Sequence, residues 1–91
     1  MTYECHITCN RDDHSIVQNV GEPAGWKFSK IDGDPLLGQK VFCYLTRHHR
    51  DFEALKSLMQ AMTSALKIVG VEVVREKIEH IIYDTKTGAG L

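Results

Sequence analysis

The sequence predicts a single α+β domain in which one antiparallel β-sheet carries two helices on one face. Four segments have the composition or the two-residue alternation of strands, and two have the hydrophobic spacing of helices. These segments follow one another as strand, helix, strand, strand, helix, strand. The chain has 91 residues, of which 43% are hydrophobic, enough for one modest core.

The first predicted strand, Tyr3–Asn10, has two different faces because side chains on a strand alternate. Its odd-numbered positions are suited to lie against helices: Tyr3, Cys5, Ile7 and Cys9. Its even-numbered positions are all polar: Glu4, His6, Thr8 and Asn10. This pattern is typical of a strand in the centre of a sheet that is covered on one side only.

The second element is a short helix, roughly His14–Val20, whose apolar residues recur at helical spacing. The polar segment Asn10–Asp13 before it offers N-cap residues. Gly21 and Pro23 end it. A helix this short depends on packing against the sheet.

Two strands joined by a loop come next. Trp26–Ile31 alternates as a strand, and Asp32–Pro35 has the composition of a turn, which Gly38 extends into a loop. Lys40–Arg47 is rich in β-branched and aromatic residues and is predicted as the third strand.

A long helix and a final strand complete the chain. Apolar residues from Phe52 to Val69 recur at three- and four-residue steps and predict a core-facing helix stripe. Asp51 is its expected N-cap, and Gly70 its C-terminal stop. Val71–Tyr83 is predicted as a long fourth strand with a bulge or bend near residues 75 and 76.

With right-handed crossovers, this order of elements predicts a ferredoxin-like βαββαβ sandwich. We expect a four-stranded antiparallel sheet in the order 4-1-3-2, both helices on one face, a domain over residues 1–84 and a flexible tail at 85–91. The first and third strands are then central neighbours, which we expect to run parallel. Cys5 and Cys9 fall on the helix side, roughly 13 Å apart along the strand, too far for a disulfide or a shared metal. No metal and no cofactor is expected.

The uncovered face of this sheet is predicted to gather polar and aromatic side chains. On the third strand, helix packing needs the apolar set Val41, Cys43 and Leu45, which leaves the alternate set for the open face: Phe42, Tyr44, Thr46 and His48. The edge strands offer further candidates for this face: Lys27 and Ser29 from the second strand, and Glu72 or, past a bend, Lys77 and Glu79 from the fourth.

The tripeptide His6-Ile7-Thr8 resembles the H-x-T/S motif of the two-histidine phosphoesterase superfamily. That resemblance implies metal-free chemistry on cyclic phosphates or on RNA and nucleotide phosphodiesters, with one histidine as base and another as acid. The family has two such motifs. Here the nearest counterpart of the second is Thr46-Arg47-His48, the same residue types in reverse order. The candidate catalytic residues are therefore His6, Thr8, Thr46 and His48, with Tyr44 or Lys77 assisting or a homodimer supplying the second motif.

The segment Lys40-Val41-Phe42-Cys43-Tyr44-Leu45 resembles the RNP1 strand of the RNA-recognition motif, with Val41 in place of its glycine. That resemblance implies that Phe42 and Tyr44 stack on unpaired bases. The cluster His48-His49-Arg50 precedes the long helix, where cations beside a helix N-terminus favour anions. Because we expect the central strands to run parallel, we place this cluster near Thr8 and Asn10, with His49 and Arg50 binding phosphate.

Composition limits the partners. The net charge of −1 argues against general polyanion binding, so no duplex DNA is expected. The three cysteines, the absence of a signal-peptide pattern and the absence of an apolar run of about 20 residues indicate a cytoplasmic protein without a membrane partner. We expect a nucleotide- or RNA-phosphate-binding domain that forms a homo-oligomer, and the resemblance to the two-histidine phosphoesterases implies a metal-free phosphoesterase activity. The alternatives are a non-catalytic assembly module and a single-stranded RNA binder.

Overall fold

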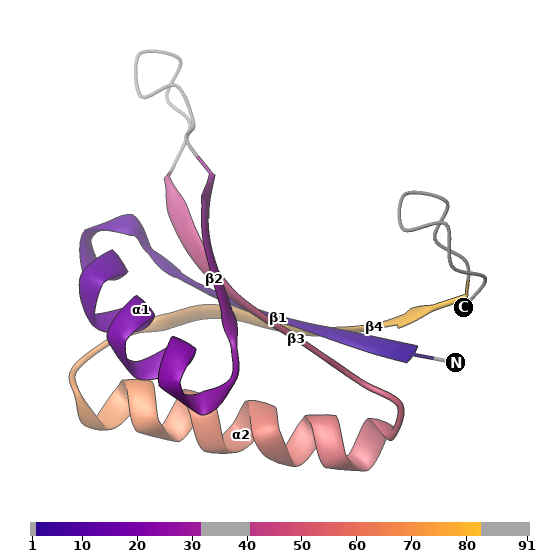
Figure 1. Cartoon of the computed structure of the whole chain (residues 1–91). Coiled ribbons are helices and arrows are strands. Elements are labelled where there is room, and N and C mark those ends of the chain that lie inside the picture. Colours follow the sequence, from indigo (N-terminus) through magenta and orange to yellow (C-terminus); the bar gives the residue numbers. More distant parts are fainter. Residues whose placement is uncertain (1, 32–40, 83–91) are drawn as a thin grey trace.

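The computed structural model describes residues 2–31 and 41–82 (Figure 1). The strands are β1 (Thr2–Asn10), β2 (Lys27–Ile31), β3 (Phe42–His49) and β4 (Val73–Ile81). The helices are α1 (His14–Gly21) and α2 (Phe52–Ile68), with the 3-10 helices η1 (Arg11–Asp13) and η2 (Glu22–Ala24) at either end of α1. The predicted α+β class and order of elements are thus confirmed. The predicted turn Asp32–Pro35, Gly38, Lys40 and the tail 85–91 lie outside the described residues.

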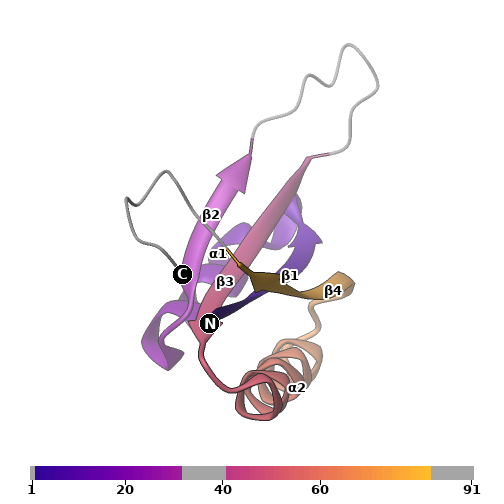
Figure 2. The same ribbon diagram turned by 90° about the vertical axis from the view of Figure 1, so that its right-hand side faces the viewer.

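The four strands form one sheet in the order β2-β3-β1-β4, which reads 4-1-3-2 from the β4 edge (Figure 2). Every neighbouring pair is antiparallel. Our expectation that the first and third strands run parallel is therefore wrong. The crossover through α1 makes β1 parallel to β2, and β3 lies between these two strands, so it is antiparallel to both.

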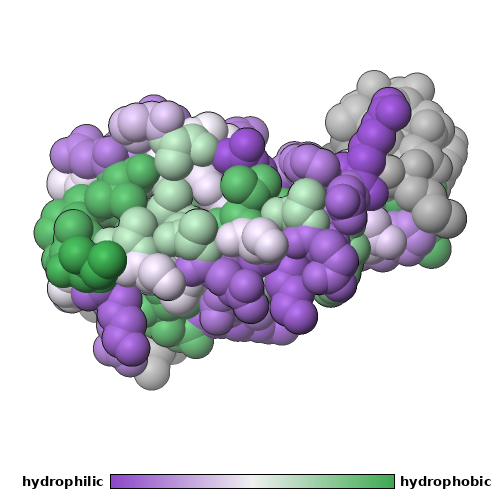
Figure 3. All heavy atoms as spheres, turned by 90° about the horizontal axis from the view of Figure 1, so that it is seen from below, coloured by the Kyte–Doolittle hydropathy of each residue, from purple (hydrophilic) through white to green (hydrophobic). Residues whose placement is uncertain are grey.

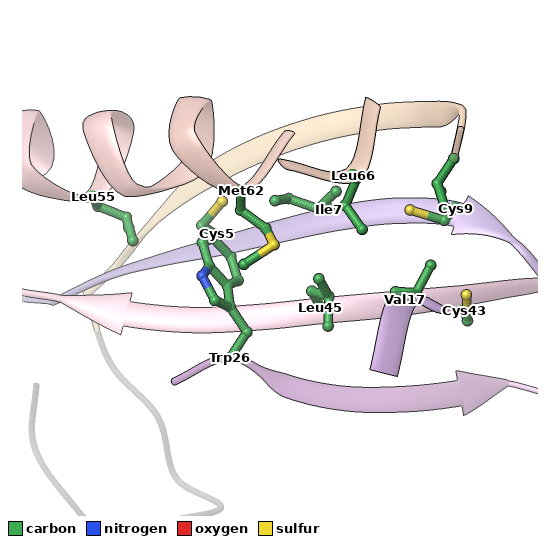
Figure 4. Close-up of a cluster of buried hydrophobic side chains, with 11 residues drawn as sticks. Cys5, Ile7, Cys9, Val17, Trp26, Cys43, Leu45, Leu55, Met62 and Leu66 are labelled. Atoms are coloured by element: carbon green, nitrogen blue, oxygen red, sulfur yellow. The ribbon is translucent and has the colours of Figure 1, made fainter. Parts of the chain in front are cut away.

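Both helices pack against the sheet, and the core lies between them and the strands. Figure 4 shows this core between α2 and the strands. The buried side chains come from every layer: Cys5, Ile7, Cys9, Val17, Trp26, Cys43, Leu45, Leu55, Met62, Leu66 and Val71. The odd positions of β1 are thus the ones that the helices cover, and so are Cys43 and Leu45 from the predicted apolar set of β3. Val41, the third member of that set, lies before β3 and is only half-buried. The position of the cysteines on the helix side is confirmed, because all three are 0% exposed.

The ends of the helices follow the predictions in part. The Asp51 carboxylate accepts the backbone N–H of Glu53 at 3.1 Å and caps α2, and Gly70 adopts a left-handed φ of 84° after it. For α1 the N-cap position falls on Asp13, within the predicted segment Asn10–Asp13, but the Asp13 side chain makes no capping bond. The chain enters α1 through the 3-10 turn η1.

Some predicted core residues are exposed. Ile16 is 43% exposed, and at the two ends of α2 Phe52 is 39% and Val69 47% exposed. In the view from the α2 side, hydrophobic residues gather where α2 ends (Figure 3), where Ile68 is 84% exposed. No helix in the described ranges is both long and apolar enough to cross a membrane.

The edge strand β4 contains a bulge that sets which of its side chains reach the open face. Arg75 faces Thr8 and Val73 faces Cys9, so Val74 is an extra residue between them. The bulge lies one residue before the predicted position. From Arg75 onward the odd-numbered residues share the open face with the even-numbered residues of β1, as expected for Lys77 and Glu79.

Candidate functional site

The strand register brings open-face side chains from all four strands into two adjacent rows. One row crosses the sheet as Lys27, Thr46, His6 and Lys77. The next row crosses it as Ser29, Tyr44, Thr8 and Arg75. The antiparallel pairing of β1 and β3 therefore places His6 and Thr8 directly beside Thr46 and Tyr44, on the side of the sheet that the helices leave open.

These rows border a depression of about 270 Å³ on the open face. It is lined by His6, Thr8, Ser29, Tyr44, Thr46, Arg75 and Lys77. Five of these residues were predicted as site residues from the sequence. The lining combines two cations, an imidazole and four hydroxyl groups, which are the side chains that bind phosphate oxygens in proteins.

The His6 imidazole has a partner at each nitrogen. Its Nδ1 lies 3.1 Å from the Thr46 hydroxyl oxygen, and its Nε2 contacts the Glu4 carboxylate. The second oxygen of that carboxylate lies 2.6 Å from the Nε2 of His48. Because a carboxylate only accepts, we assign an Nε2–H donor to each of these imidazoles. In neutral His6, Nδ1 then accepts the Thr46 hydroxyl hydrogen.

The two β4 cations of the depression differ in their surroundings. The Lys77 ammonium lies 2.8 Å from the Glu79 carboxylate, and this hydrogen bond is the largest cause that holds the pKa of Glu79 below its ordinary value. Arg75 is exposed and forms no hydrogen bond or ion pair within the described residues. The hydroxyls of Thr8 and Ser29 likewise form no hydrogen bond within the described residues. With respect to residues 2–31 and 41–82, these three groups therefore keep hydrogen-bonding capacity for a ligand.

The other predicted site residues lie outside the lining. His48 is one row further along, beside Glu4, and Phe42 faces Asn10 beyond Tyr44. Placing the His48–Arg50 cluster near Thr8 and Asn10 was wrong, because the antiparallel register sets His49 opposite Tyr3 instead. The His49 Nδ1 accepts the backbone N–H of Asp51 at 2.9 Å and so helps to shape the entry to α2.

Sequence reasoning missed two features of this face. Arg75 joins the depression only because the bulge at Val74 changes which β4 residues face outward, and the two-residue alternation of the sequence does not show that shift. Glu4 was assigned to the open face without a role. Its contact with two imidazoles depends on the antiparallel register, which pairs Glu4 with His48.

All three cysteines lie on the opposite, helix-covered side of the sheet. Cys9 on β1 and Cys43 on β3 are directly paired. We did not predict this pairing, because we expected the two strands to run parallel. Burial raises the pKa of Cys9 to about 12 and that of Cys5 to about 11. These thiols therefore stay protonated at neutral pH. Within residues 2–31 and 41–82, no three His, Cys, Asp or Glu side chains are grouped so as to hold a metal ion.

No protein-family model matches this chain, and no curated protein is significantly similar to it. The resemblances to the two-histidine phosphoesterases and to the RNA-recognition motif therefore stay predictions.

Proposed function

We propose that the open sheet face binds a phosphate group of a nucleotide or of RNA. The observation that carries this proposal is a set of donors around one depression that have no partner in the part of the chain that the structure describes: the Arg75 guanidinium and the hydroxyls of Thr8 and Ser29. Lys77 lies in the same lining and adds a second positive charge. A phosphate ester offers several acceptor oxygens and a negative charge, and so matches such a group of donors.

Binding suits the geometry better than catalysis does. A general base needs a free nitrogen lone pair, and in neutral His6 the Nδ1 accepts from Thr46 while Nε2 donates to Glu4. In this arrangement, His6 holds its neighbours in place. The adjacent Tyr44 ring gives the base or sugar of a nucleotide an apolar surface beside the phosphate.

Direct binding measurements test this proposal. We expect saturable binding in isothermal titration calorimetry. The ligands to be titrated are adenosine 2′,3′-cyclic phosphate, adenosine 3′-monophosphate and short single-stranded RNA. Loss of one charge-assisted hydrogen bond costs about 1.5–3 kcal/mol, so Arg75→Ala is expected to weaken binding by about ten- to a hundredfold.

The chain offers a matched control for this substitution. Arg50→Ala removes the same type of side chain from an exposed position that is not part of the lining, so we expect unchanged affinity. An equal loss of ligand affinity in both variants would show that the ligand is attracted nonspecifically to positive charge. Absence of ligand binding by the unaltered protein would refute the proposal.

A second candidate function is metal-free phosphoesterase chemistry at the same place. It is favoured by the arrangement of the predicted catalytic residues, because His6, Thr8 and Thr46 line one depression and His48 shares the Glu4 carboxylate with His6. Water would attack the phosphorus of a cyclic ester, the Nδ1 of His6 would take the water proton after leaving the Thr46 hydroxyl, and the ring oxygen would leave with a proton from protonated His48. Turnover of 2′,3′-cyclic nucleotides that His6→Ala abolishes would support this reaction. Binding without turnover would leave the binding function alone.

We further propose a ferredoxin-like fold for residues 1–84, a cytoplasmic location and a homo-oligomer. The order of elements and the one-sided helix layer support the fold assignment. Three free cysteines support a reducing compartment.

A further inference from the structure

We infer that the outer edge of β4 is the surface through which two copies of this chain pair, by extending the sheet across a twofold axis. Among the described residues, β4 pairs only with β1, so the backbone groups on its other side have no strand partner. With nine residues it is the longer of the two edge strands. A long edge strand with free backbone groups is a template for a further strand.

The sequence of β4 selects one register for such a pairing. In an antiparallel twofold pair, the residue at the centre faces its own copy. A centre at Arg75, Glu76, Lys77 or Glu79 would therefore place two like charges directly opposite each other, which destabilises a sheet. A centre at Ile78 avoids this and still pairs residues 75–81 of both copies. Seven facing residues correspond to roughly six to eight backbone hydrogen bonds.

In this register the charges of the two copies are complementary. Lys77 faces the partner's Glu79 on the open side of the sheet, and this contact occurs twice. The Lys77–Glu79 pair already present within each strand, at 2.8 Å, then becomes half of a group of four alternating charges. On the helix side Glu76 faces the partner's His80, and Ile78 contacts the partner's Ile78. Facing residues share a side of the sheet, because 75, 77, 79 and 81 lie opposite the even residues of β1.

The same register also accounts for two exposed hydrophobic side chains. Val74 is 47% exposed at the bulge, and Ile82 is 71% exposed just after the strand. With Ile78 at the centre, Val74 of one copy comes opposite Ile82 of the partner subunit at both ends of the pair. A hydrophobic contact would thus close each end of the ladder. The two depressions described above would lie on one face of a continuous sheet of two copies, on either side of the axis.

This inference is separate from phosphate binding and is tested without ligand. Sedimentation velocity over a range of protein concentrations is expected to show a monomer–dimer equilibrium. Lys77→Glu and Glu79→Lys each create two like-charge contacts and are expected to raise the dissociation constant by about tenfold or more. The double variant Lys77→Glu/Glu79→Lys restores opposite charges and is expected to recover the dimer. Lys56→Glu, on the exposed surface of α2, is the control for net charge and should leave the equilibrium unchanged.

Cross-linking tests the register itself. Ile78→Cys places two thiols at the twofold axis, where mild oxidation should give a covalent dimer. Val74→Cys is the matched control, because in this register its two copies are eight residues apart along the strands, or about 27 Å. The native cysteines are buried and do not compete. Three results would each overturn the inference. The protein could be monomeric at all concentrations, the dissociation constant could be unchanged by the charge reversals, or the two cysteine variants could cross-link equally.

Discussion

Replacing Gly21 with alanine is expected to destabilise the protein, although alanine usually strengthens a helix. Gly21 ends α1 with a φ of −79° and a ψ of −47°, which any residue can adopt. The obstacle is space. A Cβ at this position would lie 2.7 Å from the Leu45 Cδ1 atom and in still closer contact with Cδ2. Carbon atoms pack favourably at about 3.5–4.0 Å, so Leu45 has to move.

The size of this effect follows from the position of Leu45. Its side chain is 0% exposed on a central strand and has no solvent to move into. Overpacking of this kind costs about 1–3 kcal/mol, while the change from glycine to alanine returns at most about 1 kcal/mol of helix stability. We expect a net loss of about 1–2 kcal/mol in the free energy of unfolding. For a domain of this size, that lowers Tm by roughly 5–15 °C.

A double-mutant cycle tests this packing effect. The free energy of unfolding of each variant is measured by urea denaturation, with circular dichroism as the signal. Leu45→Ala alone is expected to cost about 2–5 kcal/mol, and in that background Gly21→Ala should become neutral or stabilising because the clash is gone. Gly70→Ala is the control. Alanine at this position is strained by a positive φ of 84°, but among the described residues its Cβ would have no neighbour within 4 Å, so the substitution should show no coupling to Leu45. A Gly21→Ala protein more stable than the unaltered one, or an equal loss in both backgrounds, would refute the packing argument.

Three further predictions concern a helix cap, an ion pair and the buried thiols. Asp51→Ala removes the N-cap bond of α2 and is expected to cost about 0.5–2 kcal/mol of stability, measured by urea denaturation. Lys77→Met removes the hydrogen bond to Glu79 and should raise the pKa of that carboxyl toward its ordinary value, measured by NMR titration. The pKa values of Cys5 and Cys9 are higher in the folded than in the unfolded chain. Their contribution to stability is therefore fully present below pH 9.0 and is lost as the pH rises toward about 11 to 12, measured as the free energy of unfolding against pH.

Each of these predictions has a control. Asp13→Ala removes an aspartate at the N-cap position of α1 that makes no capping bond, and a loss as large as that of Asp51→Ala would contradict the assigned cap. An unchanged Glu79 titration in Lys77→Met would contradict the ion pair. For the thiols, Cys9→Ser replaces one of the two thiols by a hydroxyl that does not ionise in this pH range, so it should reduce the alkaline loss of stability to the part that comes from Cys5. A loss of the same size in that variant would assign the effect to other groups.

The open face was predictable from the sequence where alternation alone decides the direction of a side chain. On β1 the contrast between Ile7 and its polar neighbours His6 and Thr8 fixes which side meets the helices, and the structure agrees. Arg75 could not be predicted in this way, because one extra residue at Val74 reverses the alternation along β4.

Local pattern in the sequence determined the elements, their order and most of the residues that face the core, because hydrophobic periodicity reflects which side of a helix or strand leaves water. It failed for Ile16, Phe52 and Val69, which are exposed. Only the tertiary structure decided which residues of different strands are neighbours. The antiparallel register joins Glu4 to both His6 and His48 and moves His49 away from Thr8. Pairing between strands depends on contacts between residues far apart in the chain, and no local pattern encodes it.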